Sequence, residues 1–462
     1  MNDRPSASIL KVIILVLLLL AVVVTVVLVI AVNSPPTSIV PPTEATTALR
    51  SHGLLHILLA LVAIVATARV AGAAVRLVGQ PAVMGELLGG ILLGPTVLGR
   101  IVPDTAAYLF PTTLTPTLGI IAQLGVVLFM FLVGLELDLR LLRRGGATTL
   151  AVSMSSVAVP FVLGASTAFL LFDRFAPNGV SFAAFALFMG VSLAVTAFPV
   201  LARILKEFGM HGTRIGALAL TSAAINDLTA WCLLALVVGV ATAQPETALS
   251  TAVLTLGFVV LLLFVARPLV NRYWPRLEAS SRLSRETAMA VAIGAALLSA
   301  FVTEWIGIHA IFGAFLIGVA MSAGGRIGQE VTGRLEDVVR VLLLPVFFAY
   351  TGLRTQFGLL DTATDWATCL GIIVVATAGK LGGTFVAAKF MGLGTRQSAM
   401  LGVLMNTRGL VELIVLNVGL DLGIISPRLF AMLVIMALVT TFATTPLMRL
   451  LMRGQQPMVA GR

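Results

Sequence analysis

The most regular feature of the sequence is a series of apolar runs separated by short breaks of charged residues, proline or glycine. A helix of about 20 apolar residues crosses the hydrocarbon core of a bilayer. The pattern therefore predicts one N-terminal apolar helix, Ile9–Val32, and thirteen further spans. These thirteen lie approximately at 54–78, 82–101, 117–138, 147–172, 182–206, 213–241, 248–270, 286–303, 305–323, 335–353, 366–391, 396–420 and 427–451.

The composition supports this pattern. Hydrophobic residues make up 59% of the chain, charged residues only 11%, and the mean hydropathy is +1.07. Soluble domains carry roughly 25% charged residues, so this chain has too few to cover a surface that faces water. No hydrophilic stretch is long enough to form a soluble domain. The sequence therefore predicts an all-α, multi-pass integral membrane protein whose surroundings are the lipid bilayer.

The basic residues orient the predicted spans. Of the 30 lysines and arginines, 22 fall on one side of the predicted topology, 5 on the other, and 3 (Arg69, Lys380 and Arg408) inside spans. Cytoplasmic loops are enriched in lysine and arginine, so both termini are predicted to be cytoplasmic, in the plasma membrane of a bacterium. The net charge of +10 has the same explanation, because the basic residues are spread through short loops and form no patch for nucleic acid.

The N-terminal run is longer than the 7–15 apolar residues of a signal peptide. We interpret Ile9–Val32 as an uncleaved membrane anchor, followed by an outside linker rich in proline and threonine, Asn33–Thr47. The expected organisation is an anchor and linker over 1–50, a transmembrane domain over 51–454 and a short cytoplasmic tail over 455–462.

Other chemistry finds little support. Cys232 and Cys369 both lie in apolar runs and indicate no disulfide framework. His52 and His56 are one helical turn apart, but no third ligand accompanies them, so no metal site is predicted. No nucleophile and base stand in a pattern that indicates an enzyme, and nothing indicates a cofactor.

Two spans carry polar interruptions. The span 182–206 contains Val195-Thr196-Ala197-Phe198-Pro199, and the span 396–420 contains Met405-Asn406-Thr407-Arg408-Gly409. Pro199 donates no N–H and disturbs the helix before it, which frees the Val195 carbonyl and the Thr196 hydroxyl for a cation. Unwound backbone at membrane depth is tolerated only beside protein or a water-filled cavity. A plain proline kink is the alternative for the first of these spans.

The interrupted spans occupy matching places in the order of helices. Each is the middle member of a triplet, and the two triplets are offset by seven spans. An odd offset reverses the direction in the membrane, so the triplets are predicted to be inverted repeats, an arrangement typical of secondary transporters.

Two charged residues fall near the middle of the bilayer. Asp227 and Lys380 each lie about fourteen residues into a span, or roughly 21 Å along the helix axis. Charges at this depth are costly and indicate function, although a buried Asp–Lys pair that only holds helices together is the structural alternative. Arg408 and Glu412, four residues apart on one helix face, can pair with each other, and a structural role for them is equally compatible with the sequence.

A buried carboxylate can bind a proton or a hard monovalent cation through the same oxygens. Burial and a neighbouring ammonium act in opposite directions on the affinity of a carboxylate for protons. Competition at Asp227, with only the loaded states moving, would produce antiport. A passive or gated cation channel is the main alternative, although no selectivity-filter run such as Thr-Val-Gly-Tyr-Gly is present; a membrane scaffold without transport activity is a third.

Several stretches resemble the monovalent cation:proton antiporter-2 family, within the sodium/proton exchanger fold. The resemblance runs from about Leu54 to Met452 and is greatest to plant-type cation/proton exchangers and their bacterial relatives. It is carried by Gln80-Pro81-Ala82-Val83-Met84-Gly85-Glu86, Phe131-Leu132-Val133-Gly134-Leu135-Glu136-Leu137-Asp138, Ala197-Phe198-Pro199-Val200-Leu201-Ala202-Arg203, Ala224-Ile225-Asn226-Asp227, Gly379-Lys380-Leu381-Gly382-Gly383-Thr384 and Asn406-Thr407-Arg408-Gly409-Leu410-Val411-Glu412-Leu413.

The resemblance implies a thirteen-helix exchanger with a core domain and a dimer domain, assembled as a homodimer. It implies that Asp227 binds the cation and the proton and that Lys380 compensates charge. The electrogenic branch of the family has two adjacent aspartates where this chain has Asn226 and Asp227, so electroneutral exchange of K⁺ or Na⁺ for H⁺ is expected. The expected site comprises Asp227, Asn226, Thr196 and Lys380, and the residues expected to support the broken helices are Pro199, Asn406, Thr407, Arg408 and Glu412.

Overall fold

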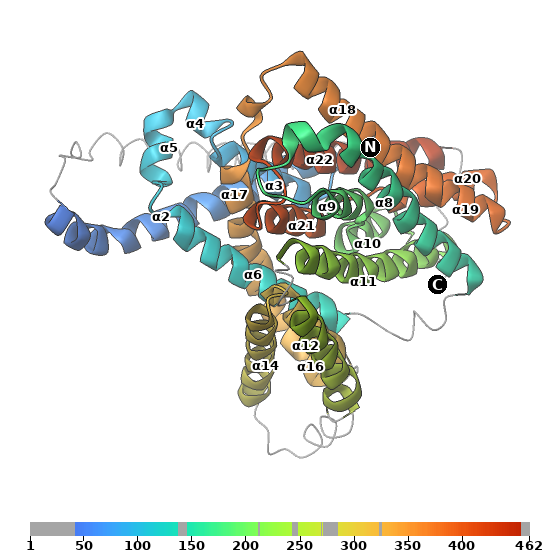
Figure 1. Ribbon diagram of the computed structural model, residues 1–462, viewed down its shortest axis with the longest axis horizontal. Helices are drawn as coiled ribbons and strands as arrows, with labels where there is room; N and C mark the ends of the chain where they lie inside the picture. The colour runs from blue at the N-terminus through green and yellow to red at the C-terminus, as the bar shows by residue number, and fades with distance from the viewer. Residues whose placement is uncertain are drawn as a thin grey trace, which may run out of the picture. The chain divides into compact units, whose positions relative to one another are not determined.

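The computed structural model describes residues 42–136, 146–210, 213–242, 248–268 with 270, 285–322 and 326–453. Every regular element in these ranges is helical (Figure 1). Ten of the helices are long and apolar enough to cross a membrane, and one pair bent by 44°, Thr395–Met405 with Leu410–Asp421, would form an eleventh span. The predicted anchor Ile9–Val32 and the tail 455–462 lie outside the described residues.

The helices follow the predicted spans closely, and together they form an all-α multi-pass membrane protein. Their bounds are α2 Pro42–Leu77, α3 Ala82–Leu93, α4 Leu98–Ile101, α5 Pro103–Leu109, α6 Thr115–Glu136, α8 Ala147–Phe175, α9 Phe182–Ala194, α10 Phe198–Glu207, α11 Arg214–Thr242, α12 Ala248–Val260, α14 Arg285–Ile306, α15 Ala310–Met321, α16 Arg326–Val338, α17 Leu344–Arg354, α18 Ala363–Thr377, α19 Gly383–Phe390, α20 Thr395–Met405, α21 Leu410–Asp421 and α22 Pro427–Met452.

Several boundaries differ from the prediction, among them the start of α16 at Arg326, ahead of the span predicted at 335–353. Helix α2 begins at Pro42, so the last part of the segment predicted as a linker is helical. The span predicted at 305–323 is a twelve-residue helix, α15, because α14 continues to Ile306 before the chain turns. At this turn Gly307, with φ 95°, donates to the Thr303 carbonyl at 3.1 Å, and the next N–H also donates to Thr303. A glycine in the left-handed region with this bond pattern is a common way to end a helix.

The chain forms two compact units. The described residues of the smaller unit are 42–125 together with 338–358. Within it, α3 crosses α17 with the two backbones in contact, since a Cβ added at Gly90 would lie 2.2 Å from the Phe348 carbonyl oxygen, and one at Gly352 would lie 2.1 Å from that of Gly90. Thr96 adds a hydrogen bond of 2.7 Å from its hydroxyl to the Thr355 carbonyl. Close backbone approach through small residues is typical of helix packing in membranes.

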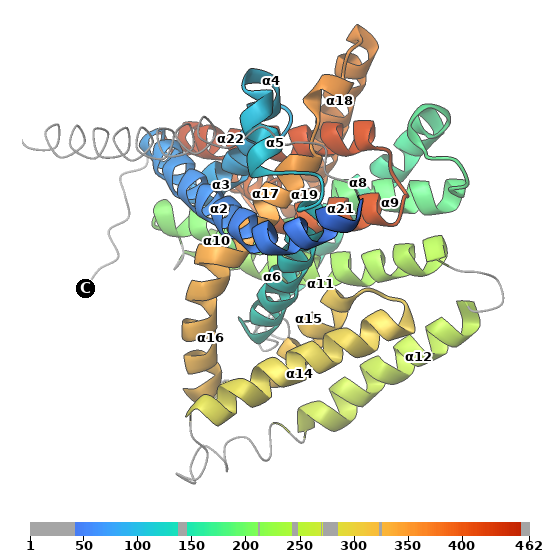
Figure 2. The same cartoon turned by 90° about the vertical axis from the view of Figure 1, so that its left-hand side faces the viewer.

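The larger unit contains 126–337 and 359–462. In it α9 packs against α8, α11 and α21, and α21 packs against α22 (Figure 1). Helix α14 packs against both α12 and α15 (Figure 2). The segments 182–207 and 214–242 therefore meet the distant segment 378–412 in one bundle. All of the predicted site residues belong to this unit.

Candidate functional site

The two interrupted helices cross at their breaks. Helix α9 ends at Ala194 and α10 begins at Phe198, while α20 ends at Met405 and α21 begins at Leu410. The extended segments between them are joined by a backbone hydrogen bond of 3.0 Å from the Ala197 N–H to the Thr407 carbonyl. Both predicted interruptions are therefore present. Pro199 is the second residue of α10, a position at which proline is well tolerated because the first N–H groups of a helix have no intrahelical partner.

The broken helix α9 ends inside the protein, and two cations cap it. Arg408 donates to the Ser192 carbonyl at 2.7 Å and to the Leu193 carbonyl at 2.6 Å. Lys380 Nζ donates to the Ala194 carbonyl. The last carbonyls of a helix lack intrahelical donors and carry a partial negative charge. The two basic side chains thus supply both the missing donors and a complementary charge.

Arg408 also pairs with Glu412, as their spacing predicted. The guanidinium and the Glu412 Oε2 atom are 2.8 Å apart, and both side chains are fully buried. The Arg408 backbone is held in turn by Thr441 of α22, whose hydroxyl accepts from the Arg408 N–H at 2.9 Å and donates to its carbonyl at 3.0 Å. The unwound segment is therefore held to α9 by the Arg408 side chain and to α22 by the Arg408 backbone.

Lys380 lies in a single π-helical turn, residues 378–382, between α18 and α19. Such turns widen a helix locally and are frequent at functional sites. The Lys380 side chain is fully buried, and its charged neighbours are Arg408, Glu412 and Asp227. Two acids and two bases are therefore clustered around the crossing.

Asp227 differs from the other three charged groups because neither of its carboxylate oxygens has a hydrogen-bond partner among the described residues. The residue is only 3% exposed. It lies close to Lys380 and to the backbone N–H of Phe198 at the start of α10, although that N–H does not reach hydrogen-bonding geometry. Buried polar atoms in proteins are almost always paired, so the two bare carboxylate oxygens set Asp227 apart from the paired charges around it.

Asn226, the neighbour of Asp227, is part of a buried polar network. Its side-chain amide lies 2.9 Å from the Ser153 hydroxyl, 2.8 Å from that of Ser156 and 3.1 Å from that of Thr196. Either orientation of the amide keeps it bonded to these three hydroxyls. The Thr196 hydroxyl donates to the Met405 carbonyl at 3.1 Å, which links the two broken helices through one side chain.

In the structure Thr196 contacts Asn226, and Lys380 is a charged neighbour of Asp227. Asn406 and Thr407 lie in the break. The Thr407 hydroxyl donates to the Leu404 carbonyl at the end of α20. The side-chain amide oxygen of Asn406 has no partner among the described residues.

The sequence analysis assigned no role to Ser153, Ser156 or Thr441. The run Ser153-Met154-Ser155-Ser156 within an apolar span was the available signal for the two serines. Thr441 stands among other buried threonines of α22, so nothing in the sequence distinguished it.

Comparison with known proteins agrees with this architecture. Residues 57–452 match the family described as "Sodium/hydrogen exchanger, transmembrane". The chain is similar to the Na⁺/H⁺ antiporter NhaS4 of Synechocystis, with 41% identity over 85% of this chain and 96% of that protein. It is also similar to cation/H⁺ antiporter 20 of Arabidopsis thaliana, with 41% identity over 83% of this chain, and to K⁺/H⁺ antiporter 1 of Saccharomyces cerevisiae, with 36% identity over 80%. The matched regions cover 47% and 42% of those two longer relatives.

The fold is shared with a solved structure, the sodium proton antiporter MjNhaP1 of Methanocaldococcus jannaschii. The TM-score is 0.62 at 15% sequence identity, and the alignment covers 87% of this chain and all of that one. The family match extends over most of the chain and includes both broken helices and the four buried charges. The chain therefore belongs to the sodium/hydrogen exchanger family.

Proposed function

We propose that this protein exchanges a monovalent cation, K⁺ or Na⁺, for H⁺ by alternating occupancy of Asp227. The observation that carries the proposal is the pair of bare carboxylate oxygens on a side chain that is only 3% exposed. A buried carboxylate without donors is unfavourable unless a proton or a cation occupies it. Either can do so, and each excludes the other.

The neighbouring groups suit a small hard cation. Thr196 and the amide of Asn226, the chain neighbour of Asp227, are bonded to each other and would supply neutral oxygens, and oxygen ligands are what such cations prefer. Lys380 donates to the Ala194 carbonyl of α9 and has Asp227 among its charged neighbours. We assign it the charge-compensating role. The names of the relatives include Na⁺/H⁺ and K⁺/H⁺ antiporters, and the ligand types favour neither ion.

We further propose that the exchange is electroneutral. The cluster contains Asp227 and Glu412 as acids and Lys380 and Arg408 as bases, and Asn226 cannot ionise. One proton or one monovalent cation at Asp227 adds the same charge, so the loaded states do not differ in charge. A membrane potential of 100 mV acts on each net charge with about 2.3 kcal/mol. The gradient at which proton flux vanishes should therefore be independent of voltage.

The proposed architecture is thirteen crossing helices that contain two inverted triplets, with both termini cytoplasmic, in a homodimer in a bacterial plasma membrane. The bent pair α20–α21 and the broken pair α9–α10 support the inverted arrangement. The short helix α15 and the apolar segment Val253–Ala266 would be the remaining two spans beside the eleven longer ones.

The test is proton flux from vesicles reconstituted with the full chain, followed with a pH-sensitive dye as K⁺ or Na⁺ is added. Asp227→Asn should remove cation-driven proton flux while the yield and monodispersity of the purified protein stay unchanged. Asn417→Ala is a matched control and should keep exchange, because Asn417 donates to the Leu413 carbonyl of its own helix at 2.9 Å and belongs neither to the four buried charges nor to the break. Normal flux in Asp227→Asn would refute the proposal.

A further inference from the structure

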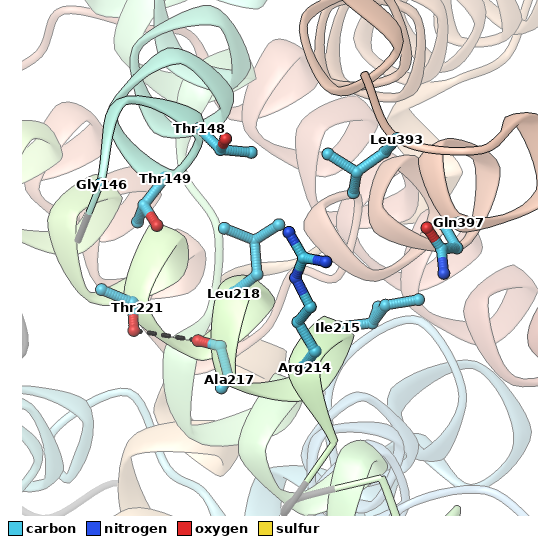
Figure 3. Close-up of a pocket in the computed structure, with 10 residues that line it drawn as sticks. All are labelled: Gly146, Thr148, Thr149, Arg214, Ile215, Ala217, Leu218, Thr221, Leu393 and Gln397. Carbon is cyan, nitrogen blue, oxygen red and sulfur yellow. Dashed lines mark hydrogen bonds between the residues drawn. The ribbon is translucent and has the colours of Figure 1, made fainter. Parts of the chain in front are cut away.

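A cavity of about 360 Å³ lies within the larger unit, and none of the described residues that line it belongs to the crossing of the broken helices. It is formed by the first turns of α8 and α11 and by the turn that leads from α19 into α20 (Figure 3). The charge distribution of the sequence predicts this end of the bundle to be cytoplasmic. The volume falls at the lower end of the range for small-molecule sites, about 300–1,000 Å³.

The cavity contains a basic side chain. Of the described residues that line it, Arg214 is the one that is charged, and its side chain is also exposed to solvent. Its guanidinium extends across the space toward Thr148 and Leu393 (Figure 3), and it forms no hydrogen bond or ion pair with the residues that the structure describes. An unpaired arginine repels cations, so this cavity is a poor path for the exchanged ion. Guanidinium groups bind phosphate with paired, charge-assisted hydrogen bonds.

Two helix N-termini at the cavity lack side-chain caps. Helices α8 and α20 start from Gly146 and Gly394, which offer no side-chain acceptor. In contrast, the start of α11 is capped by Thr213, whose hydroxyl accepts from the Gly216 N–H at 3.1 Å. Uncapped first-turn N–H groups and the positive end of the helix dipole favour an anion. The two helices thus add donors to the charge of Arg214.

Thr149 contributes a hydroxyl to the wall of the cavity. It lines the cavity and is only 8% exposed, yet its hydroxyl makes no hydrogen bond with the described residues. The neighbouring Thr221 behaves differently, because its hydroxyl donates to the Ala217 carbonyl at 2.9 Å (Figure 3). The Thr149 hydroxyl is therefore a donor that a ligand in the cavity could use.

We propose that this cavity binds a small phosphate-bearing anion. The phosphate would bind between Arg214 and the first turns of α8 and α20 and would accept from Thr149. The apolar wall of Ile215, Leu218 and Leu393 would contact the non-phosphate part of the molecule. The same chemistry is offered by a soluble phosphate ester and by the headgroup of an anionic lipid.

The experiment measures binding to the purified full chain. Glycerol 3-phosphate is titrated by calorimetry, with glycerol as the uncharged control. In parallel, the melting temperature is compared in nanodiscs of phosphatidylcholine alone and in nanodiscs that also contain phosphatidylglycerol. The variants are Arg214→Gln, Thr149→Val, which keeps the side-chain shape, and Lys206→Gln, which removes an exposed basic residue that does not line the cavity.

Saturable binding of glycerol 3-phosphate supports a soluble phosphate ester if the variants respond as expected. Arg214→Gln should weaken this binding about tenfold or more. Thr149→Val should also weaken it, and Lys206→Gln should leave it unchanged. Stabilisation by phosphatidylglycerol alone, lost in the same two variants, supports a lipid headgroup. Absence of both effects, or equal binding by Arg214→Gln, would overturn the proposal. Asp227→Asn should bind as the wild type does, so this outcome is independent of the exchange mechanism.

Discussion

Replacement of Arg408 by glutamine tests whether the buried charges at the crossing form one energetic unit. Arg408 makes hydrogen bonds of 2.7 and 2.6 Å to two carbonyls of α9 and one of 2.8 Å to Glu412. All of these groups are shielded from water, since Arg408 and Glu412 are fully buried. Loss of the guanidinium leaves two carbonyls without a donor and one carboxylate without its partner.

The magnitude follows from these contacts. Each unpaired buried carbonyl costs about 1–3 kcal/mol, and breaking a buried ion pair from one side costs about 3–5 kcal/mol. Arg408→Gln should therefore destabilise by roughly 5 kcal/mol or more, a large part of the about 5–15 kcal/mol that holds a typical protein folded. Glu412→Gln alone should cost only about 1–3 kcal/mol, because Arg408 keeps its bonds to α9.

The double variant Arg408→Gln/Glu412→Gln distinguishes the pair from the cap. It has no unpaired carboxylate at position 412, but the carbonyls of Ser192 and Leu193 still lack the donor that Arg408 supplied. It should be more stable than the sum of the single changes predicts, by about 3–5 kcal/mol. The free energy of unfolding can be measured by titration with dodecyl sulfate in mixed micelles. If the single effects simply add to within about 0.5 kcal/mol, the two side chains are not coupled and this reasoning is wrong.

Three further predictions concern other parts of the protein. Asp365→Ala should lower the free energy of unfolding by about 1–3 kcal/mol, because this buried carboxylate caps α18 and pairs with Arg174 of α8 at 2.9 Å. Equal denaturation curves for the variant and the wild type would contradict this. Gly352→Val should prevent close packing on Gly90 and reduce the yield of folded protein, whereas Gly371→Ala, at a position with open space around it, should have wild-type yield. Burial lowers the pKa of His309 although nearby carboxylates oppose the shift, so the unfolded chain binds more protons just below the ordinary histidine pKa of about 6.5. The melting temperature should therefore fall as the pH is lowered through that value, and His309→Gln should weaken the dependence; an unchanged pH profile in the variant would assign the effect to another group.

The sequence by itself determined the features that depend on local composition. A span is a run of apolar residues, so most helix bounds follow from the run itself, including those of α6 and α22. The two breaks were visible because Pro199 and the polar run beginning at Asn406 are out of place in apolar spans. Asp227 and Lys380 were visible as candidates for the same reason, since a charge at that depth is costly wherever the helix packs.

Tertiary structure decided which groups these residues meet. The sequence does not reveal that Arg408 and Lys380 cap the end of α9, because the contacts join residues about 190–220 positions apart and depend on how the broken helices cross. The bonds from Ser153 and Ser156 to Asn226 likewise exist only where α8 and α11 pack together. Local patterns report how much polarity a helix carries, whereas the partner of each buried polar group is set by packing between distant segments, where every unpaired group costs free energy.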